Sequence, residues 1–289
     1  MPCQVAKFLP AVAVAQMDKV LLMVRDIANP SADDPYFPQW RHKDWFLGSS
    51  WASGIVKRSW GPDPHGRNQE SISEAVNAYD GVQLYGEHLR QALLVVAGTG
   101  ARAHQSDADA ASAVAVAARV RDTGRVMLAT ELQAAKAFWQ VCGGAGCGSP
   151  GEPGFAPRTY PPAYAPRVVG QVWSSSAEMQ TWFGSAPWKV FGIQLLPQTA
   201  VSETLWGSSW VRDGVLAAFA TSCEGDPAAC VGQGWSTLSW GAAAVLGGCR
   251  VAWDQVASLP AAVYATDGGN GQSRTNALWW IATRCPYDE

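Results

Sequence analysis

The sequence predicts a mainly α fold, in which successive helices joined by polar loops form an α/α toroid. Several segments place apolar residues at helical spacing, and short runs rich in Gly and Pro separate them. Strand signals are few and short. A chain of 289 residues can bury a sizeable core, and neither an internal repeat nor a clear linker divides it. Residues 1–289 are therefore predicted to form one domain.

Two helices are predicted in the first third of the chain. Residues 12–24 are apolar but interrupted by polar side chains, which favours an amphipathic helix over a signal peptide. The helix over 18–28 ends at Asn29-Pro30, because proline cannot continue it. Residues 71–94 form the second helix. Its inner stripe is predicted to consist of Ala75, Tyr79, Val82, Tyr85 and Leu89.

Further helices follow a break at residues 98–105. The Ala-rich segment 107–120 and the segment 125–141 are predicted as two separate helices. Residues 143–166 are dense in Gly and Pro, so we expect an irregular loop there. The helices predicted in the C-terminal half are 177–182, 210–222, 236–246 and 273–283.

Composition excludes several classes of partner. The net charge of -3 argues against nucleic acid, whose binding surfaces are usually basic. No run approaches the roughly 18 apolar residues of a membrane span. We therefore expect neither a nucleic-acid nor a membrane partner. The protein is also expected to be a monomer. The 15 Trp residues suggest a carbohydrate cleft, because flat rings stack on the apolar faces of sugars; core packing is the alternative for each ring.

The seven cysteines favour local disulfides over a metal site. Cys142/Cys147 and Cys223/Cys230 each bracket a short segment rich in small residues, which suits an oxidising compartment. An odd count leaves at least one cysteine unpaired. The four histidines lie far from the cysteines in sequence, so no metal is predicted.

The most informative motif pairs two carboxylates, Glu70 and Glu74, four residues apart. On a helix this spacing puts both on one face with Cβ atoms about 5–6 Å apart, where like charges repel. Asn68, Gln69 and Asn77 add hydrogen-bonding groups to the same turns. This pattern suits a surface that holds water and sugar hydroxyls. Alternatively, Asn68 is an N-cap and the glutamates complement the positive end of the helix dipole.

A second polar segment, residues 41–54, precedes this motif. It mixes ionisable groups, Trp and small residues without an apolar period, so it is predicted to be a structured loop or cleft wall. Trp45 and Trp51 flank its polar part and are the tryptophans best placed to contact a sugar.

Residues 41–54 and 66–79 together resemble the catalytic domain of glycoside hydrolase family 81, the endo-1,3-β-glucanases. The family patterns read RHKDW-x-x-GHSWASG and G-x-NQES-x-SEAVNAY. The resemblance spans nearly the whole chain in the family's order. It continues through residues 129–131, 169–174, 181–184, 192–197 and 276–284.

The resemblance implies an (α/α)6 barrel and endo-hydrolysis of β-1,3-glucan with inversion. Inversion needs an acid and a base on opposite faces of the scissile bond, about 6.5–9.5 Å apart. Neighbours on one helix approach the sugar from the same side, so Glu70 and Glu74 form only one half of the machinery. The family motif implies that Glu70 is the general base and that Glu74 assists. No cofactor is implied, and the substrate implies an extracellular or cell-wall location.

Two departures from the family pattern stand out. In the family, the aspartic acid lies in a D-x-H-F-H-Y-G-Y segment that precedes a stretch similar to Val5–Phe8, and only four residues precede that stretch here. We therefore expect the acid-bearing segment and the family's β-sandwich to be absent, and the toroid to be incomplete at its N-terminal side. Ser49 stands where the pattern has histidine, which removes an imidazole from the cleft wall.

Two functions follow as hypotheses. The first is an endo-1,3-β-glucanase, and the second is a β-1,3-glucan-binding relic that uses a Trp-lined cleft without hydrolysis. His42 and Asp44 belong to the cleft by resemblance, and a surface ion pair of Asp44 with Arg41 or Lys43 is the alternative. The candidate substrate-binding residues are His42, Asp44, Trp45, Trp51, Asn68, Gln69 and Asn77.

Overall fold

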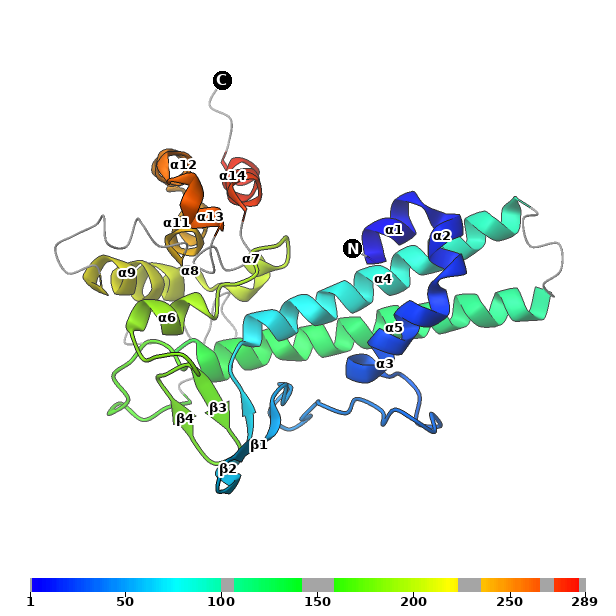
Figure 1. Cartoon of the computed structure of the whole chain (residues 1–289), viewed down its shortest axis with the longest axis horizontal. Helices are drawn as coiled ribbons and strands as arrows, with labels where there is room; N and C mark the ends of the chain where they lie inside the picture. The colour runs from blue at the N-terminus through cyan, green and yellow to red at the C-terminus, as the bar shows by residue number, and fades with distance from the viewer. Residues whose placement is uncertain (1, 100–106, 142–158, 223–234, 266–272, 286–289) are drawn as a thin grey trace. The chain divides into compact units, whose positions relative to one another are not determined.

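The computed structural model describes residues 2–99, 107–141, 159–222, 235–265 and 273–285, which belong to two compact units (Figure 1). The helical unit comprises Met1–Ser50 and Ala75–Glu131. The sheet-containing unit comprises Trp51–Glu74 and Leu132–Glu289. A single domain over residues 1–289 stays a prediction.

Three helices begin the helical unit: α1 (Pro2–Phe8), α2 (Pro10–Ala15) and α3 (Met17–Ala28). Pro10 occupies the first position of α2, where its missing N–H is not needed. The backbone bends again at Gln16, which lies between α2 and α3. The predicted end of the helix at Asn29-Pro30 is confirmed, since α3 stops at Ala28.

Two long helices, α4 (Ile72–Gly98) and α5 (Asp107–Ala134), run side by side through the helical unit (Figure 1). The predicted inner stripe of α4 is confirmed at four of its positions. Tyr79, Val82, Tyr85 and Leu89 are buried, whereas Ala75 is half-buried. An apolar stripe at helical spacing therefore faces the core, as the sequence pattern indicates.

The contact between α4 and α5 depends on two glycines. A Cβ atom at Gly86 of α4 would lie 2.3 Å from the backbone nitrogen of Arg121. One at Gly124 of α5 would lie 2.5 Å from the backbone nitrogen of Gln83. The prediction of separate helices over 107–120 and 125–141 is wrong, because Gly124 serves close helix packing and does not break α5. A short π-helical turn, η1 (Ala135–Trp139), follows α5.

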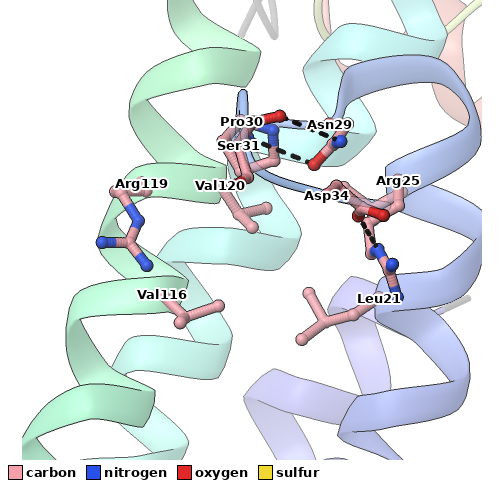
Figure 2. Close-up of a pocket in the computed structure, with 10 residues that line it drawn as sticks. Leu21, Arg25, Asn29, Pro30, Ser31, Asp34, Val116, Arg119 and Val120 are labelled. Carbon is pink, nitrogen blue, oxygen red and sulfur yellow. Dashed lines mark hydrogen bonds and ion pairs between the residues drawn. The ribbon is translucent and has the colours of Figure 1, made fainter. Parts of the chain in front are cut away.

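A pocket of about 160 Å³ lies between α3 and α5 in the helical unit (Figure 2). Leu21 of α3 and the α5 residues Val116 and Val120 supply its apolar walls, and Arg119 is also at its edge. The segment that follows α3 also lines it, and an ion pair there joins Arg25 to Asp34 at 2.5 Å. This pocket therefore lies where α3 and the segment after it face α5.

The sheet-containing unit holds a small antiparallel sheet in the order β1-β2-β3-β4. Its strands are β1 (Gly54–Arg58), β2 (Gly61–Gln69), β3 (Gln171–Trp173) and β4 (Ala177–Glu178). The predicted helix over 177–182 is wrong. Gly170 and Trp173 donate backbone hydrogen bonds to Glu178 and Ser176, so this segment returns as a tight hairpin. In the sequence, only the few, short strand signals hinted at this sheet.

The rest of this unit is helical, and three predicted helices are confirmed. Residues 210–222 form a continuous helical segment with a π-helical middle, 236–246 correspond to α11, and 273–283 to α14. The unit contains α6 (Pro187–Gly192), α7 (Ser202–Leu205), α8 (Ser208–Trp210), η3 (Val211–Leu216), α9 (Ala217–Ser222), α11 (Trp235–Val245), α12 (Cys249–Ser258), α13 (Ala261–Ala265) and α14 (Arg274–Ala282). Its core includes Trp139, Trp206, Leu238 and Trp280.

A disulfide joins Cys249, at the start of α12, to Cys285, which follows α14. The sequence pattern did not indicate this pair, because 36 positions separate the two cysteines and no short loop brackets them. The predicted pairs Cys142/Cys147 and Cys223/Cys230 lie outside the described residues.

Candidate active site

Glu70 lies at a junction where the chain passes from the sheet to a long helix. Asn68 and Gln69 pair with Trp173 and Val172 of β3, which keeps the backbone extended as far as residue 69. The helix α4 begins only at Ile72. The prediction that Glu70 and Glu74 share a helix is therefore wrong: only Glu74 is helical, because strand pairing extends through Gln69.

Ser71 caps the helix that follows. Its hydroxyl accepts a hydrogen bond from the backbone N–H of Glu74 at 3.3 Å, as an N-cap residue does. The sequence Ser71-x-x-Glu74 matches the capping-box pattern, so Glu74 also suits the start of a helix. The expected cap, Asn68, is instead part of β2.

Two buried side chains fix the backbone of Glu70. Its carbonyl oxygen accepts hydrogen bonds from Trp139 Nε1 at 3.1 Å and from Gln194 Nε2 at 2.9 Å. The Oε1 atom of Gln194 accepts the N–H of Ile72 at 3.2 Å, so one amide joins both sides of the junction. Trp139 is fully buried and Gln194 nearly so, which makes this junction a rigid part of the unit.

The carboxylate of Glu70 is half-buried and held by one backbone donor. Its Oε1 accepts the N–H of Trp182 at 2.6 Å. Burial raises the pKa of Glu70, the Trp182 hydrogen bond lowers it, and the negative charge of Glu74 raises it further. The net direction is upward. A fixed, partly exposed carboxylate with a raised pKa has the properties of a general base or acid.

Glu74 differs from Glu70 in its environment. Its side chain is exposed, and it lies in the first turn of α4, where the helix dipole stabilises a negative charge. The Glu74 carboxylate acts on Glu70 through its charge.

Aromatic rings surround this part of the sheet. Trp182 is 43% exposed and contacts Trp173 edge-on, with ring centroids 5.5 Å apart. The guanidinium of Arg58 lies 5.1 Å from the Trp182 ring and is itself held by Asp63 at 2.8 Å. Cations at this distance from an aromatic face are attracted to it, which orders both side chains. The result is a partly exposed ring whose own backbone N–H binds Glu70.

The remaining candidates in this unit are buried. Asn68 and Gln69 are shielded from solvent, and their amides donate to Gln171 Oε1 at 3.1 Å and to Ser71 O at 3.3 Å. Trp51 is 3% exposed, so it packs as a core residue and offers little surface to a sugar. These three side chains support the junction from inside the protein.

The other four candidates belong to the helical unit. Trp45 is 44% exposed and packs edge-on against Trp40, while His42 and Asn77 are half-buried. The Asp44 carboxylate accepts the N–H groups of Phe46 at 3.0 Å and Leu47 at 3.1 Å, which shapes the predicted loop. Two neighbours of Asp44 have other ion-pair partners: Arg41 pairs with Asp26 and Lys43 with Glu131.

Ser49, the residue that replaces the family's histidine, is fully buried. Its hydroxyl makes no hydrogen bond with any described residue. The substitution therefore changes the interior of the loop.

The structure thus brings Trp51, Asn68, Gln69, Glu70 and Glu74 together in the sheet-containing unit and places His42, Asp44, Trp45 and Asn77 in the helical unit. Sequence reasoning missed Trp139, Trp182 and Gln194 as partners of Glu70. Trp182 and Gln194 do lie in stretches that carry the family resemblance, which was the available signal. Among the described residues, no cluster of His, Cys, Asp and Glu could hold a metal ion. No described helix is long and apolar enough to cross a membrane.

The mainly helical fold with a small sheet thus holds one half-buried carboxylate, Glu70, against the backbone of the partly exposed Trp182. The family model described as "Glycosyl hydrolase family 81 C-terminal domain" matches residues 3–108 and 109–281. The chain belongs to this family.

Named relatives agree with this assignment. The chain is 30% identical to a glucan endo-1,3-beta-D-glucosidase of Glycine max over 239 aligned residues. This alignment covers 81% of this chain and 28% of the relative. It is 44% identical to glucan endo-1,3-beta-D-glucosidase 2 of Saccharomyces cerevisiae over 69 aligned residues. This alignment covers 24% of this chain and 8% of the relative. The chain therefore spans less than a third of the length of these relatives.

A solved structure supports the fold. The family 81 glycoside hydrolase of Clostridium thermocellum, solved as a mutant, matches with a TM-score of 0.69 and 20% identity, over 98% of this chain and 32% of that one. The predicted mainly α, (α/α)6-type fold class is thereby confirmed, with a small sheet in addition.

Proposed function

We propose that this chain supplies the general-base half of an inverting endo-hydrolase of β-1,3-glucan, with Glu70 as the base. The observation that carries the proposal is the environment of Glu70: a fixed backbone, a half-buried carboxylate and a raised pKa. The family membership supplies the reaction class and the relatives' names supply the glucan.

In this proposal Glu70 activates the attacking water through Oε2. The Trp182 N–H occupies Oε1, so the water is proposed to lie at the other carboxylate oxygen. A raised pKa makes the carboxylate a better proton acceptor once it is ionised. Glu74 assists through its charge, which raises the pKa of Glu70.

Hydrolysis with inversion also needs an acid on the opposite face of the glycosidic bond. The family resemblance assigns this role to an aspartate in a segment that precedes the stretch matching Val5–Phe8. We assign the acid to no residue of this chain. Glu74 is too close to Glu70 in the chain to reach the opposite face, so it is not the acid in this proposal.

Sugar binding is assigned to exposed rings and polar groups. Trp182 beside Glu70 and Trp45 in the loop each expose more than two fifths of their surface, which suits stacking on glucose rings. His42, Asp44 and Asn77 are proposed to contact hydroxyl groups. The proposed location, extracellular or in the cell wall, follows from the proposed β-1,3-glucan substrate.

The test is reducing-sugar release from laminarin by the purified chain. If the chain is catalytically complete, Glu70→Gln abolishes release while the surface variant Asp254→Asn keeps it. If wild type binds laminari-oligosaccharides but releases no sugar, the alternative of a glucan-binding protein without hydrolysis is favoured. A chain that is well folded yet neither binds nor cleaves β-1,3-glucan would contradict both.

A further inference from the structure

A buried ion pair in the helical unit joins the loop that follows α3 to helix α5. Lys43 Nζ lies 3.4 Å from Glu131 Oε1, and both side chains are fully buried. Neither residue is assigned a role by the proposed reaction. Buried charges are costly, and an ion pair of this kind is often no more stabilising than apolar side chains of similar size. Stability alone is therefore a poor explanation for it.

The ammonium of Lys43 makes contacts within its own loop as well. It donates to the carbonyl of Gly48 at 2.5 Å and to the carbonyl of Met127 on α5 at 3.4 Å. The buried Lys43 ammonium thus contacts both Gly48, near the end of its own loop, and helix α5. A lysine ammonium has three donors, and the two carbonyls occupy two of them, while the contact with Glu131 is one of opposite charges.

The other end of the loop is held by α4. Lys43 and Ser50 form an antiparallel bridge, and the Ser50 hydroxyl lies 2.6 Å from the Tyr79 hydroxyl. Tyr79 is buried on α4, with its ring 5.6 Å from the Lys43 ammonium. Inside the loop, Asp44 N–H donates to Ser49 O at 2.9 Å and Gly48 N–H donates to Asp44 O at 2.8 Å.

The outer side of the loop is exposed. Trp45 is 44% and Phe46 is 97% accessible to solvent. The Lys43 ammonium lies 5.8 Å from the Trp45 ring, close enough for a favourable cation–ring attraction. The buried contacts therefore fix the position of an exposed ring and of Asp44, which are both candidates for sugar contact.

We infer that Lys43 and Glu131 are positioning residues: their buried ion pair holds residues 43–50 in the conformation that presents Asp44 and Trp45 to β-1,3-glucan. This inference rests on the proposed function for its ligand. Its structural part, the ordering of the loop, stands on the contacts above.

The experiment compares the wild-type 289-residue chain with Lys43→Met, Glu131→Leu and the double variant. Each single variant leaves one charge buried without its partner, so it lowers the melting temperature. The double variant removes both charges and recovers most of that loss. It still lacks the hydrogen bonds to Gly48 O and Met127 O, so we expect residues 43–50 to stay less ordered than in wild type.

Two further readouts separate positioning from stability. Hydrogen exchange of the Asp44 and Gly48 amides is expected to be roughly tenfold faster in the double variant than in wild type. Affinity for a laminari-oligosaccharide is expected to fall roughly tenfold, because the loop must be ordered on binding. The control is Arg41→Met with Asp26→Leu, which removes an exposed ion pair between α3 and the segment just before the loop and should change neither readout.

A double variant with wild-type exchange and wild-type affinity would overturn the inference. Faster exchange with unchanged affinity would also overturn it, because the loop would then be ordered for another purpose. Wild-type protein that binds no laminari-oligosaccharide would overturn the proposed function and the link to glucan. The exchange comparison would still decide whether the ion pair orders the loop, so the two failures are distinguishable.

Discussion

The backbone N–H of Trp182 donates a hydrogen bond of 2.6 Å to Oε1 of Glu70, across 112 positions of the chain. This bond joins a partly exposed aromatic ring to the candidate base. Substrate stacked on the ring would lie beside the carboxylate, and the donor stabilises the ionised form that a base requires. This hydrogen bond therefore links Trp182, a proposed sugar-binding residue, to Glu70, the proposed base.

Removing the charge of Glu74 should shift the pH dependence of hydrolysis. The negative charge of Glu74 raises the pKa of Glu70, so Glu74→Gln lowers it. A base works only when ionised, and the acid limb of the profile of kcat/KM follows its pKa. If the chain is catalytically complete, we expect this limb to move to lower pH in the variant, as measured on laminarin. A limb that stays in place or moves to higher pH would contradict the assignment of Glu70 as base.

Gln194 should matter for both stability and activity. Its amide pairs with the carbonyls of Glu70 and Gly170 and with the N–H of Ile72. Gln194→Leu removes this partner from the Ile72 N–H and the Gly170 carbonyl and leaves the Glu70 carbonyl with Trp139 as its donor. We therefore expect a loss of about 3 kcal/mol in the free energy of unfolding. Urea unfolding measures this loss, and laminarin hydrolysis under conditions where the variant is folded should fall with it.

The matched comparison for Gln194 is Trp139→Phe. It keeps an aromatic ring in the core and removes only the single donor at 3.1 Å to the Glu70 carbonyl. We expect a smaller loss, about 1–2 kcal/mol. Equal stabilities of both variants and wild type would show that the junction does not depend on these hydrogen bonds.

The pH dependence of stability should report on Glu131. Burial raises its pKa to about 7, although the Lys43 charge and nearby hydrogen bonds lower it. Between pH 4.5, its ordinary value, and about 7, the folded protein therefore binds more protons than the unfolded chain. This group thus makes stability fall as pH rises through that window, by on the order of 3 kcal/mol.

Glu131→Gln should remove this fall, as measured by urea unfolding at several pH values. The variant is also expected to be less stable at neutral pH, because Lys43 loses its partner. The diagnostic quantity is therefore the slope of stability against pH and not its level. A variant with the wild-type slope would assign the titration to another group.

Much of the helical pattern could be predicted from the sequence because it depends on local periodicity. The stripe containing Tyr79 and Leu89 faces the core in α4, and α11 and α14 correspond to the helices predicted over 236–246 and 273–283. The hairpin of β3 and β4 could not be predicted in this way. Its strands are too short to show a periodic pattern, and backbone pairing with β2 decides their conformation.

The candidate site shows the same division. The paired glutamates could be found from residue types and spacing, but their separation between junction and helix could not. Strand pairing through Gln69 places Glu70 outside α4, and that pairing involves residues more than 100 positions away. The ion pair between Lys43 and Glu131 is similarly non-local, so spacing along the chain carries no sign of it.

The two glycines of the α4–α5 contact give a prediction that opposes helix propensity. Alanine is better than glycine within a helix by about 1 kcal/mol, so propensity alone predicts that Gly86→Ala and Gly124→Ala stabilise the protein. A Cβ atom at either position would instead lie within 2.5 Å of the partner helix backbone. We expect each variant to lose about 1–3 kcal/mol, as measured by urea unfolding, because the helices must separate. Gly81→Ala is the matched control on α4, since its Cβ would meet nothing within 4 Å, and it should be neutral or stabilising. Stabilisation by all three substitutions would contradict the close approach of the two helices.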